Sequence, residues 1–214
     1  MADERLDDVM RRVISYDRRR VVKEYRRISD MLANYSPVLD LGCGSGTLLE
    51  TLRGRGVEGV GVDASSTAVD ACRSQGLNAI QADIFGFLER TLENSYGAAF
   101  AGHVLEHLEP GEGRRLFNLV YRALRPGGRF VLLTPNPRNI YVAGEGFWID
   151  PTHVRPYPEP LIRSLALDAG FADHVVTRWM QGMPIRQTAA GFVRWLMTAG
   201  LHDPAPALLA VSTK

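Results

Sequence analysis

The sequence predicts an α/β domain with a parallel sheet that is covered by helices on both faces. Short apolar segments of strand character alternate with helical patterns from residue 37 to residue 134, which is the order typical of βαβ units. The first apolar segment leads into a glycine-rich turn at residues 42–46 (GCGSG), and a helical pattern begins at Thr47. A strand, a glycine turn and a helix in this order are typical of a binding site for a nucleotide-type cofactor.

Length and charge narrow the class of protein. The 214 residues are enough for one domain with a sheet covered on both faces, and the 25 basic and 24 acidic residues nearly cancel, so net charge does not favour a nucleic-acid or membrane partner. No apolar run approaches the roughly 20 residues of a membrane span, and the first residues lack the apolar core of a signal peptide. Cys43 and Cys72 do not suggest a disulfide framework. We therefore expect a cytoplasmic enzyme or binding domain, whose oligomeric state stays open.

The N-terminal segment predicts a helical cap. Apolar residues recur at helical spacing over residues 5–34, so we expect one or two amphipathic helices in a cap at 1–35, followed by the main domain at 36–214. The other face of these helices is basic and carries Arg11, Arg12, Arg18, Arg19, Arg20, Lys23, Arg26 and Arg27. This face is either a solvated surface or a lid whose cations meet an acidic substrate.

The remaining elements follow in order along the chain. Apolar patterning predicts strands at 37–41, 57–62, 78–82, 98–102 and 129–134, with helices at 45–54, 65–75, 84–93 and 111–125. Five prolines and two glycines at 135–158 predict a long irregular loop, and loops of that length usually carry function. After it we expect a helix at 159–169, a strand at 174–179, a helix around 189–197 and a last strand at 208–211.

The glycine spacing separates two classes of cofactor. A dinucleotide site needs the pattern G-x-G-x-x-G, but here the position of its third glycine is Thr47. The strand before the turn also carries Asp40 near its end. A carboxylate at this point would repel a pyrophosphate, whereas it suits a cationic ligand or a network of hydroxyl groups.

The stretch VLDLGCGSG (residues 38–46) resembles the first motif of class I S-adenosylmethionine-dependent methyltransferases. GVGVD, QADIF and LRPGGRFVLLTPN resemble later parts of that family in the same order. The resemblance covers roughly residues 37–136 and implies a Rossmann-like, seven-stranded sheet with S-adenosylmethionine as methyl donor. It further implies that the cofactor is held by Asp40, Gly42 and Gly44, by Asp63 on the ribose hydroxyls, by Asp83 on the adenine amino group and by Ile84 on the ring.

The segment after the fourth strand, HVLEH, offers groups for methyl transfer. A neutral hydroxyl is a poor nucleophile and needs a base or a metal ion. Helical spacing predicts that His103, Glu106 and His107 point together toward the cofactor. The segment is similar to the E-x-x-E-H of metal-dependent O-methyltransferases, such as ubiquinone-pathway and small-RNA 3′-end enzymes, which add a later histidine. The resemblance implies that His103, Glu106, His107 and His153 bind Mg²⁺, Mn²⁺ or Zn²⁺, with His103 in place of a glutamate. A metal-free base (His103, His107 or His153) and a purely structural role stay open.

The loop segment FWIDPTHVRPY at 147–157 is the candidate acceptor site. Phe147, Trp148 and Tyr157 are candidates for an apolar or sugar-stacking wall, and Arg155 for contacts to an anion or hydroxyls. The segment is similar to bacterial methyltransferases of polysaccharide and glycan assembly, which implies a small-molecule or oligosaccharide acceptor. Three alternatives stay open: a quinone-type or other small aromatic acceptor, an RNA 3′ end, which the neutral charge disfavours, and a cofactor-binding scaffold without catalysis.

Overall fold

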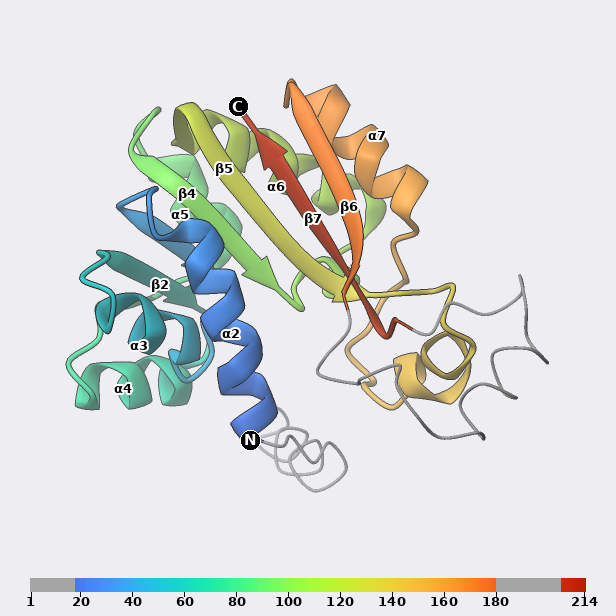
Figure 1. The fold of residues 1–214 in the computed structure, drawn as a ribbon, viewed down its shortest axis with the longest axis horizontal. Coiled ribbons are helices and arrows are strands. Elements are labelled where there is room, and N and C mark those ends of the chain that lie inside the picture. Colours follow the sequence, from blue (N-terminus) through green and yellow to red (C-terminus); the bar gives the residue numbers. More distant parts are fainter. Residues whose placement is uncertain (1–17, 180–204) are drawn as a thin grey trace.

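A computed structural model describes residues 18–179 and 205–214. Within this part of the chain, seven strands form one sheet in the order β3-β2-β1-β4-β5-β7-β6 (Figure 1). The strands are β1 Val38–Leu41, β2 Gly59–Asp63, β3 Ala79–Gln81, β4 Tyr96–Gly102, β5 Leu124–Pro135, β6 Asp173–Trp179 and β7 Ala207–Thr213. Strands β1 to β5 pair in parallel, while β7 is antiparallel to both β5 and β6. The predicted α/β class and the seven-stranded, Rossmann-like sheet are confirmed.

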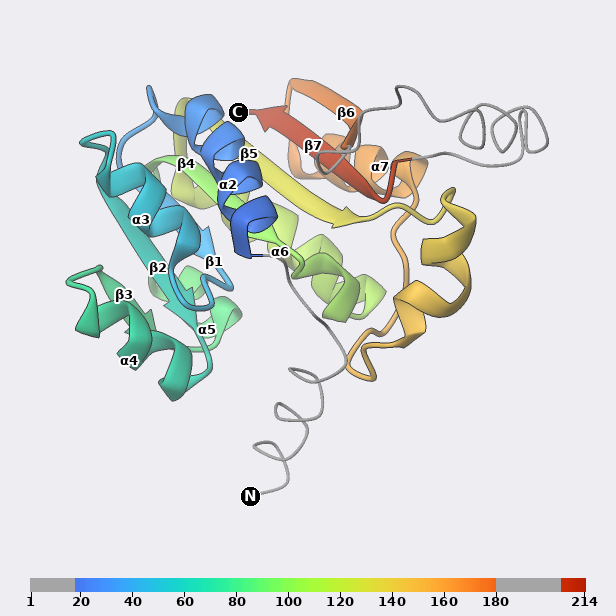
Figure 2. The same cartoon turned by 60° about the horizontal axis from the view of Figure 1, so that its bottom comes forward.

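Helices cover both faces of this sheet (Figures 1 and 2). The helices are α2 Arg18–Leu32, α3 Thr47–Arg53, α4 Ser66–Ser74, α5 Ile84–Arg90, α6 Pro110–Ala123 and α7 Glu159–Ala169. Buried residues of α5, α6 and α7 form one core with the sheet, while α2 and α3 share another with the opposite face. Residues of α3 and α4 pack together in a third cluster around Cys43 and Cys72. The strands are nearly continuous apolar runs in the sequence because parallel strands are buried on both faces.

Helix α2 belongs to this packing through its apolar stripe. Ile28 and Leu32 are fully buried and lie in the same cluster as Val38 of β1 and Trp179 of β6. The indole Nε1 of Trp179 donates a hydrogen bond of 2.5 Å to Glu24, and Arg27 stacks over the Trp179 ring. The contacts therefore tie α2 to the end of β6. Residues before 18 and the helix expected around 189–197 lie outside the described residues.

The expectation of an irregular loop over 135–158 is wrong in part. A short helical segment, η2 Val142–Gly146, lies within it and is broken by non-helical backbone at Gly144. Prolines occur only near the two ends of this stretch, so the backbone N–H groups between them remain available for helical bonds. Asn139 starts the segment, because its carbonyl accepts from Ala143 N and its side-chain oxygen accepts from Tyr141 N and Val142 N. In the described residues, no helix is long and apolar enough to span a bilayer.

Candidate active site

The site lies where the strand order reverses. Strand β1 is flanked by β2 and β4, and Leu41 of β1 pairs with Ala101 of β4. The chain leaves the carboxyl ends of β1 and β4 in opposite directions along the sheet, toward β2 and toward β5. This divergence opens a crevice of the kind in which α/β proteins bind ligands. The glycine turn follows β1, and HVLEH follows β4. The two segments touch, because a Cβ placed on Gly42 would lie 2.7 Å from Cγ2 of Val104.

The three glycines of the turn have different roles. Each has a positive φ, at +71° for Gly42, +52° for Gly44 and +83° for Gly46, and side chains rarely adopt this conformation. A Cβ on Gly46 would collide with Leu77 and Cys72 of the α4 region, at 2.7 and 2.8 Å. A Cβ on Gly44 would meet nothing within 4 Å. Gly46 therefore allows the turn to pack on α4, while Gly44 leaves open space above the backbone.

The carboxylates predicted to hold the cofactor lie at or just after the carboxyl ends of β1, β2 and β3. Asp63, at the end of β2, accepts hydrogen bonds from Gly44 N at 2.8 Å and from Ser65 N at 2.9 Å. These bonds fix the carboxylate beside the turn. Asp83 caps α5 by accepting from Gly86 N at 2.7 Å, and it remains exposed, with the half-buried Ile84 next to it. Asp83 therefore caps α5, and this hydrogen bond orients its side chain at the carboxyl edge of the sheet.

Asp40 is the buried acid of the site. Its exposure is 2%, and burial, assisted by the nearby Asp63 charge, raises its pKa to about 8. A carboxyl group in this state gains stability from a cation that arrives beside it. The acid therefore matches a positively charged ligand better than a pyrophosphate.

A hydrogen-bonded pair opens the segment after β4. His103 has a φ of +56°, an uncommon conformation for a residue with a side chain, and its N–H donates to Leu133 O. Its Nδ1 lies 2.9 Å from Oε1 of the fully buried Glu106, whose Oε2 accepts from Thr134 at 3.0 Å. Burial by itself would lower the pKa of His103 and raise the pKa of Glu106. The hydrogen bond and the opposite charge of the partner outweigh burial in each case, so the pKa of His103 is raised and the pKa of Glu106 is lowered.

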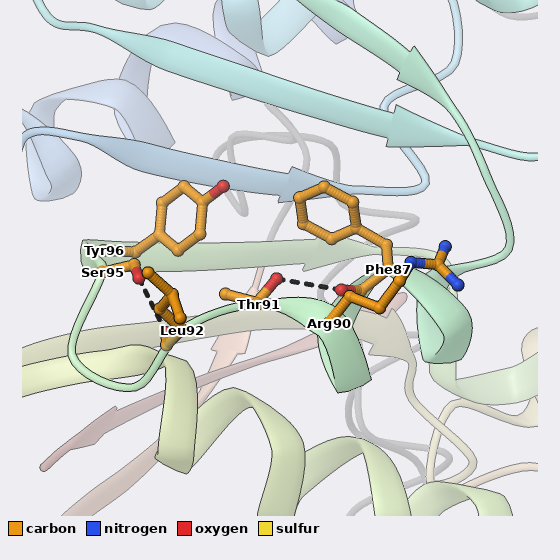
Figure 3. Close-up of a pocket in the computed structure, with 6 residues that line it drawn as sticks. All are labelled: Phe87, Arg90, Thr91, Leu92, Ser95 and Tyr96. Carbon is orange, nitrogen blue, oxygen red and sulfur yellow. Dashed lines mark hydrogen bonds between the residues drawn. The ribbon is translucent and has the colours of Figure 1, made fainter.

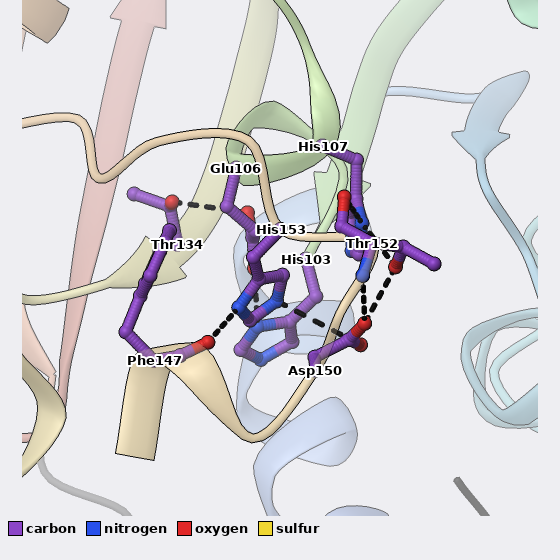
Figure 4. A network of polar contacts seen from close by, with 8 residues as sticks. All are labelled: His103, Glu106, His107, Thr134, Phe147, Asp150, Thr152 and His153. Carbon is purple, nitrogen blue, oxygen red and sulfur yellow. Dashed lines mark hydrogen bonds and ion pairs between the residues drawn. The ribbon is translucent and has the colours of Figure 1, made fainter. Parts of the chain in front are cut away.

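Two further histidines lie at this edge, with tautomers fixed by their neighbours (Figure 4). His153 Nδ1 lies 2.6 Å from the carbonyl oxygen of Phe147. A carbonyl only accepts, so Nδ1 carries the proton and Nε2 keeps a lone pair when the ring is neutral. His107 Nδ1 lies 3.2 Å from the carbonyl and 2.9 Å from the hydroxyl of Thr152. The same reasoning leaves its Nε2 available.

The predicted set of four ligands is brought together only in part. Among the described residues, one potential ligand atom each from Glu106, His107 and His153 lie within 4.8 Å of one another. His103 is not a member of this group and instead contacts it through Glu106. The expected common helical face is wrong, because the helical turn η1 covers only Leu105–His107 and the positive φ of His103 turns its side chain separately.

The predicted aromatic wall is also only partly present. Phe147 and Tyr157 are buried, at 2% and 0% exposure, and Tyr157 donates a hydrogen bond to Leu108 O. These two rings belong to the core, as is common for large apolar side chains. Trp148 is the aromatic side chain of this segment that reaches solvent, with 60% exposure. Sequence reasoning missed Thr134 and Thr152, although D-P-T directly before His153 is a pattern typical of side-chain-to-backbone turns.

A separate hollow of about 320 Å³ lies near the amino end of β4, away from the carboxyl ends of the strands (Figure 3). It is lined by Phe87, Arg90, Thr91, Leu92, Ser95 and Tyr96. Tyr96 begins β4, whereas the glycine turn and HVLEH follow the carboxyl ends of β1 and β4. The hollow therefore contains none of the predicted site residues.

The fold and the placement of the glycine turn define a class of enzyme, the S-adenosylmethionine-dependent methyltransferases. Residues 13–176 match a protein family described as a methyltransferase domain. The chain belongs to this family. Carboxy-S-adenosyl-L-methionine synthases from Yersinia pestis and Yersinia pseudotuberculosis are 33% identical over 45% of this chain. The chain covers about two fifths of the length of these curated relatives, 39% in each case.

Solved structures agree with the fold. A methyltransferase of this class from Archaeoglobus fulgidus has a TM-score of 0.78 at 22% identity, over 91% of this chain and 93% of that one. Human N-acetylserotonin methyltransferase in complex with S-adenosylmethionine has a TM-score of 0.63 at 14% identity, over 89% of this chain and 51% of that one. At such identities the likeness concerns the fold alone.

Proposed function

We propose that this enzyme transfers the methyl group of S-adenosylmethionine to a hydroxyl of a saccharide or a similar polar small molecule. The observation that carries the proposal is the cluster of Glu106, His107 and His153 at the carboxyl edge of the sheet, beside the glycine turn. The donor carries its own leaving group, so the protein has to align the acceptor and remove one proton. Two imidazoles whose Nδ1 atoms face acceptors leave their Nε2 atoms for this second task when the rings are neutral.

The proposed cofactor contacts follow from the geometry of the turn. The open space at Gly44 admits a ligand close to the backbone, and the Asp63 carboxylate beside it retains lone pairs for ribose hydroxyls. The buried Asp40 favours the positive charge of the donor. Asp83 and Ile84 are proposed to meet the adenine, since both lie at the start of α5 on the same edge.

A divalent ion fits the cluster chemically. One carboxylate and two imidazoles are a common set for Mn²⁺ or Zn²⁺, and Mg²⁺ is compatible if it keeps several waters. Glu106, His107 and His153 would hold the ion, while His103 would orient Glu106 rather than bind. Such an ion would lower the pKa of an acceptor hydroxyl. The Nδ1 hydrogen bonds of both histidines are the kind of support that orients metal ligands.

A metal-free mechanism is the second candidate, and a specific observation favours it. Both carboxylate oxygens of Glu106 already accept hydrogen bonds, from His103 and from Thr134. In this case His107 or His153 takes the proton of the acceptor through its free Nε2. Chelation separates the candidates. If an ion is used, dialysis against EDTA abolishes turnover and Mn²⁺ or Mg²⁺ restores it, whereas full turnover in EDTA supports the metal-free base.

The acceptor is proposed from the loop that carries His153. The exposed Trp148 lies edge-on to Phe147, with ring centroids 5.0 Å apart, and an exposed aromatic ring suits the apolar face of a sugar. Apolar side chains at 140, 141, 149 and 154 are also exposed, which favours a quinone-type or other small aromatic acceptor as the alternative.

An acceptor screen tests the choice. Methyl transfer from labelled donor is measured with neutral and acidic oligosaccharides and with catechol-type phenols. A saccharide acceptor predicts that Trp148→Ala raises KM at least severalfold while Trp148→Phe largely retains it. Leu92→Ala, near the amino end of β4 and 79% exposed, serves as the control. Turnover of phenols alone overturns the saccharide assignment.

A further inference from the structure

The carboxylate Asp150 is connected to both histidines of the cluster, although it is not a member of it (Figure 4). Oδ1 of Asp150 accepts from the hydroxyl of Thr152 at 2.6 Å and from the backbone N–H of Thr152 at 2.9 Å. Oδ2 lies 3.8 Å from Nε2 of His153. Oδ1 of Asp150 therefore accepts two hydrogen bonds from Thr152, which is the pattern of a carboxylate.

The direction of each hydrogen bond follows from the chemistry of the groups. A carboxylate only accepts, so Thr152 gives its single hydroxyl proton to Asp150. The hydroxyl oxygen is then left to accept at its lone pairs. His107 Nδ1, at 2.9 Å from that oxygen and 3.2 Å from the carbonyl of the same residue, has two acceptors and no donor in front of it. Nδ1 must therefore carry the proton.

We propose that Asp150 and Thr152 are positioning residues that hold His107 in the Nδ1–H tautomer with its Nε2 lone pair available to the reaction. This inference rests on the proposed function for the use of that lone pair, but the tautomer itself follows from the contacts alone. Free imidazole favours no single nitrogen strongly, so a hydroxyl that donated to Nδ1 would place the proton on Nε2 and block it. Asp150 prevents this because its carboxylate accepts the hydrogen bond that the Thr152 hydroxyl donates.

The arrangement also connects two elements that are distant in sequence. His107 lies on η1 after β4, whereas Asp150 and Thr152 lie on the segment after η2. The backbone bonds from Val154 N and Arg155 N to Glu106 O, at 2.9 and 3.3 Å, fix this segment against η1. The hydroxyl is therefore held at a defined place in front of the imidazole rather than on a separately moving loop.

The test uses the full chain and reads the tautomer directly. Nitrogen-15 NMR of the histidine side chains, without donor or metal, reports which nitrogen of His107 is protonated, and the spectrum of His107→Gln assigns the signal. In the native protein we expect protonated Nδ1. Asp150→Ala leaves the Thr152 hydroxyl free to donate to Nδ1 and should shift the population toward Nε2–H. Thr152→Val removes the hydroxyl but keeps the carbonyl acceptor at 3.2 Å, so it should retain the native signal. Thr51→Val is the control, because it removes a comparable hydroxyl bond on α3.

Turnover provides the second measurement. We expect Asp150→Ala to lower kcat by about 10- to 100-fold, the loss typical of removing such outer partners, with little change in the KM for the donor. If Asp150→Ala does not fold, the native spectrum makes the test, because a proton on Nε2 of His107 in the native protein overturns the inference. An unchanged His107 tautomer in the folded variant overturns the inference. A shifted tautomer in an enzyme that methylates no hydroxyl acceptor supports the positioning role and refutes the proposed function.

Discussion

The binding of S-adenosylmethionine should depend on pH through the buried Asp40. With a pKa of about 8 in the free protein, Asp40 is ionised in about 9% of molecules at pH 7 and in about 1% at pH 6. A cationic donor binds better to the ionised form, and an affinity scales with the fraction of competent protein. The dissociation constant should therefore fall about tenfold from pH 6 to pH 7, a range in which an α-amino group with a pKa near about 8 stays protonated.

Calorimetry tests this prediction. Binding at pH 7 should release about 0.9 proton per donor bound, which titrations in two buffers of different ionisation enthalpy measure. Asp40→Asn mimics the protonated acid, so it should bind weakly and without this pH dependence. Asp70→Asn, an exposed acid on α4, should behave like the native protein. A native dissociation constant that stays flat between pH 6 and pH 7, or a slope that persists in Asp40→Asn, would refute the role assigned to Asp40.

Other predictions concern particular contacts of the fold. Gly46→Ala should lower the melting temperature strongly because its Cβ meets packed side chains, whereas Gly44→Ala should mainly weaken donor binding; melting curves with and without donor separate the two effects. Burial lowers the pKa of His174, with a smaller contribution from a nearby arginine. The unfolded chain therefore binds a proton at His174 more readily than the folded protein does. The free energy of unfolding should be highest above about pH 6.5 and should decline below it. Urea unfolding of native protein and His174→Gln at pH 5.5 and 7.5 measures this, and an equal loss in both contradicts it. Trp179→Phe removes the hydrogen bond to the buried Glu24 and should cost about 1–3 kcal/mol, more than Glu24→Gln; urea unfolding that ranks them otherwise argues against that contact.

Local patterns were sufficient to predict most of the sheet and the glycine turn. The turn at 42–46 and the acid at 63 are short-range signals, because a positive φ requires glycine and a strand end places an acid at the edge of the sheet. The helix at 159–169 was predicted with the bounds that the structure has. The segment at 135–158 was less predictable, since its prolines hide a short helical segment that depends on the side chain of Asn139.

The cluster of Glu106, His107 and His153 depends on contacts that no spacing rule contains. Spacing suggested that residues 103, 106 and 107 form one face, but His103 leaves β4 with a positive φ and pairs with Glu106 instead. The cluster is completed by His153, which is 46 positions beyond His107 in the chain. Thr152, next to it, holds the imidazole of His107. Such partners are chosen by where two loops meet, which sequence periodicity does not encode.

The class of fold, the glycine turn and the acids at the strand ends could be predicted from the sequence, because each follows from the backbone preferences and charges of neighbouring residues. Which histidines lie together, which aromatic ring reaches solvent and which acceptors face Nδ1 of His107 could be learned only from the tertiary structure. These properties depend on the direction of side chains and of hydrogen bonds between distant segments. Those directions are fixed only when β4, β5 and the loop after η2 pack together.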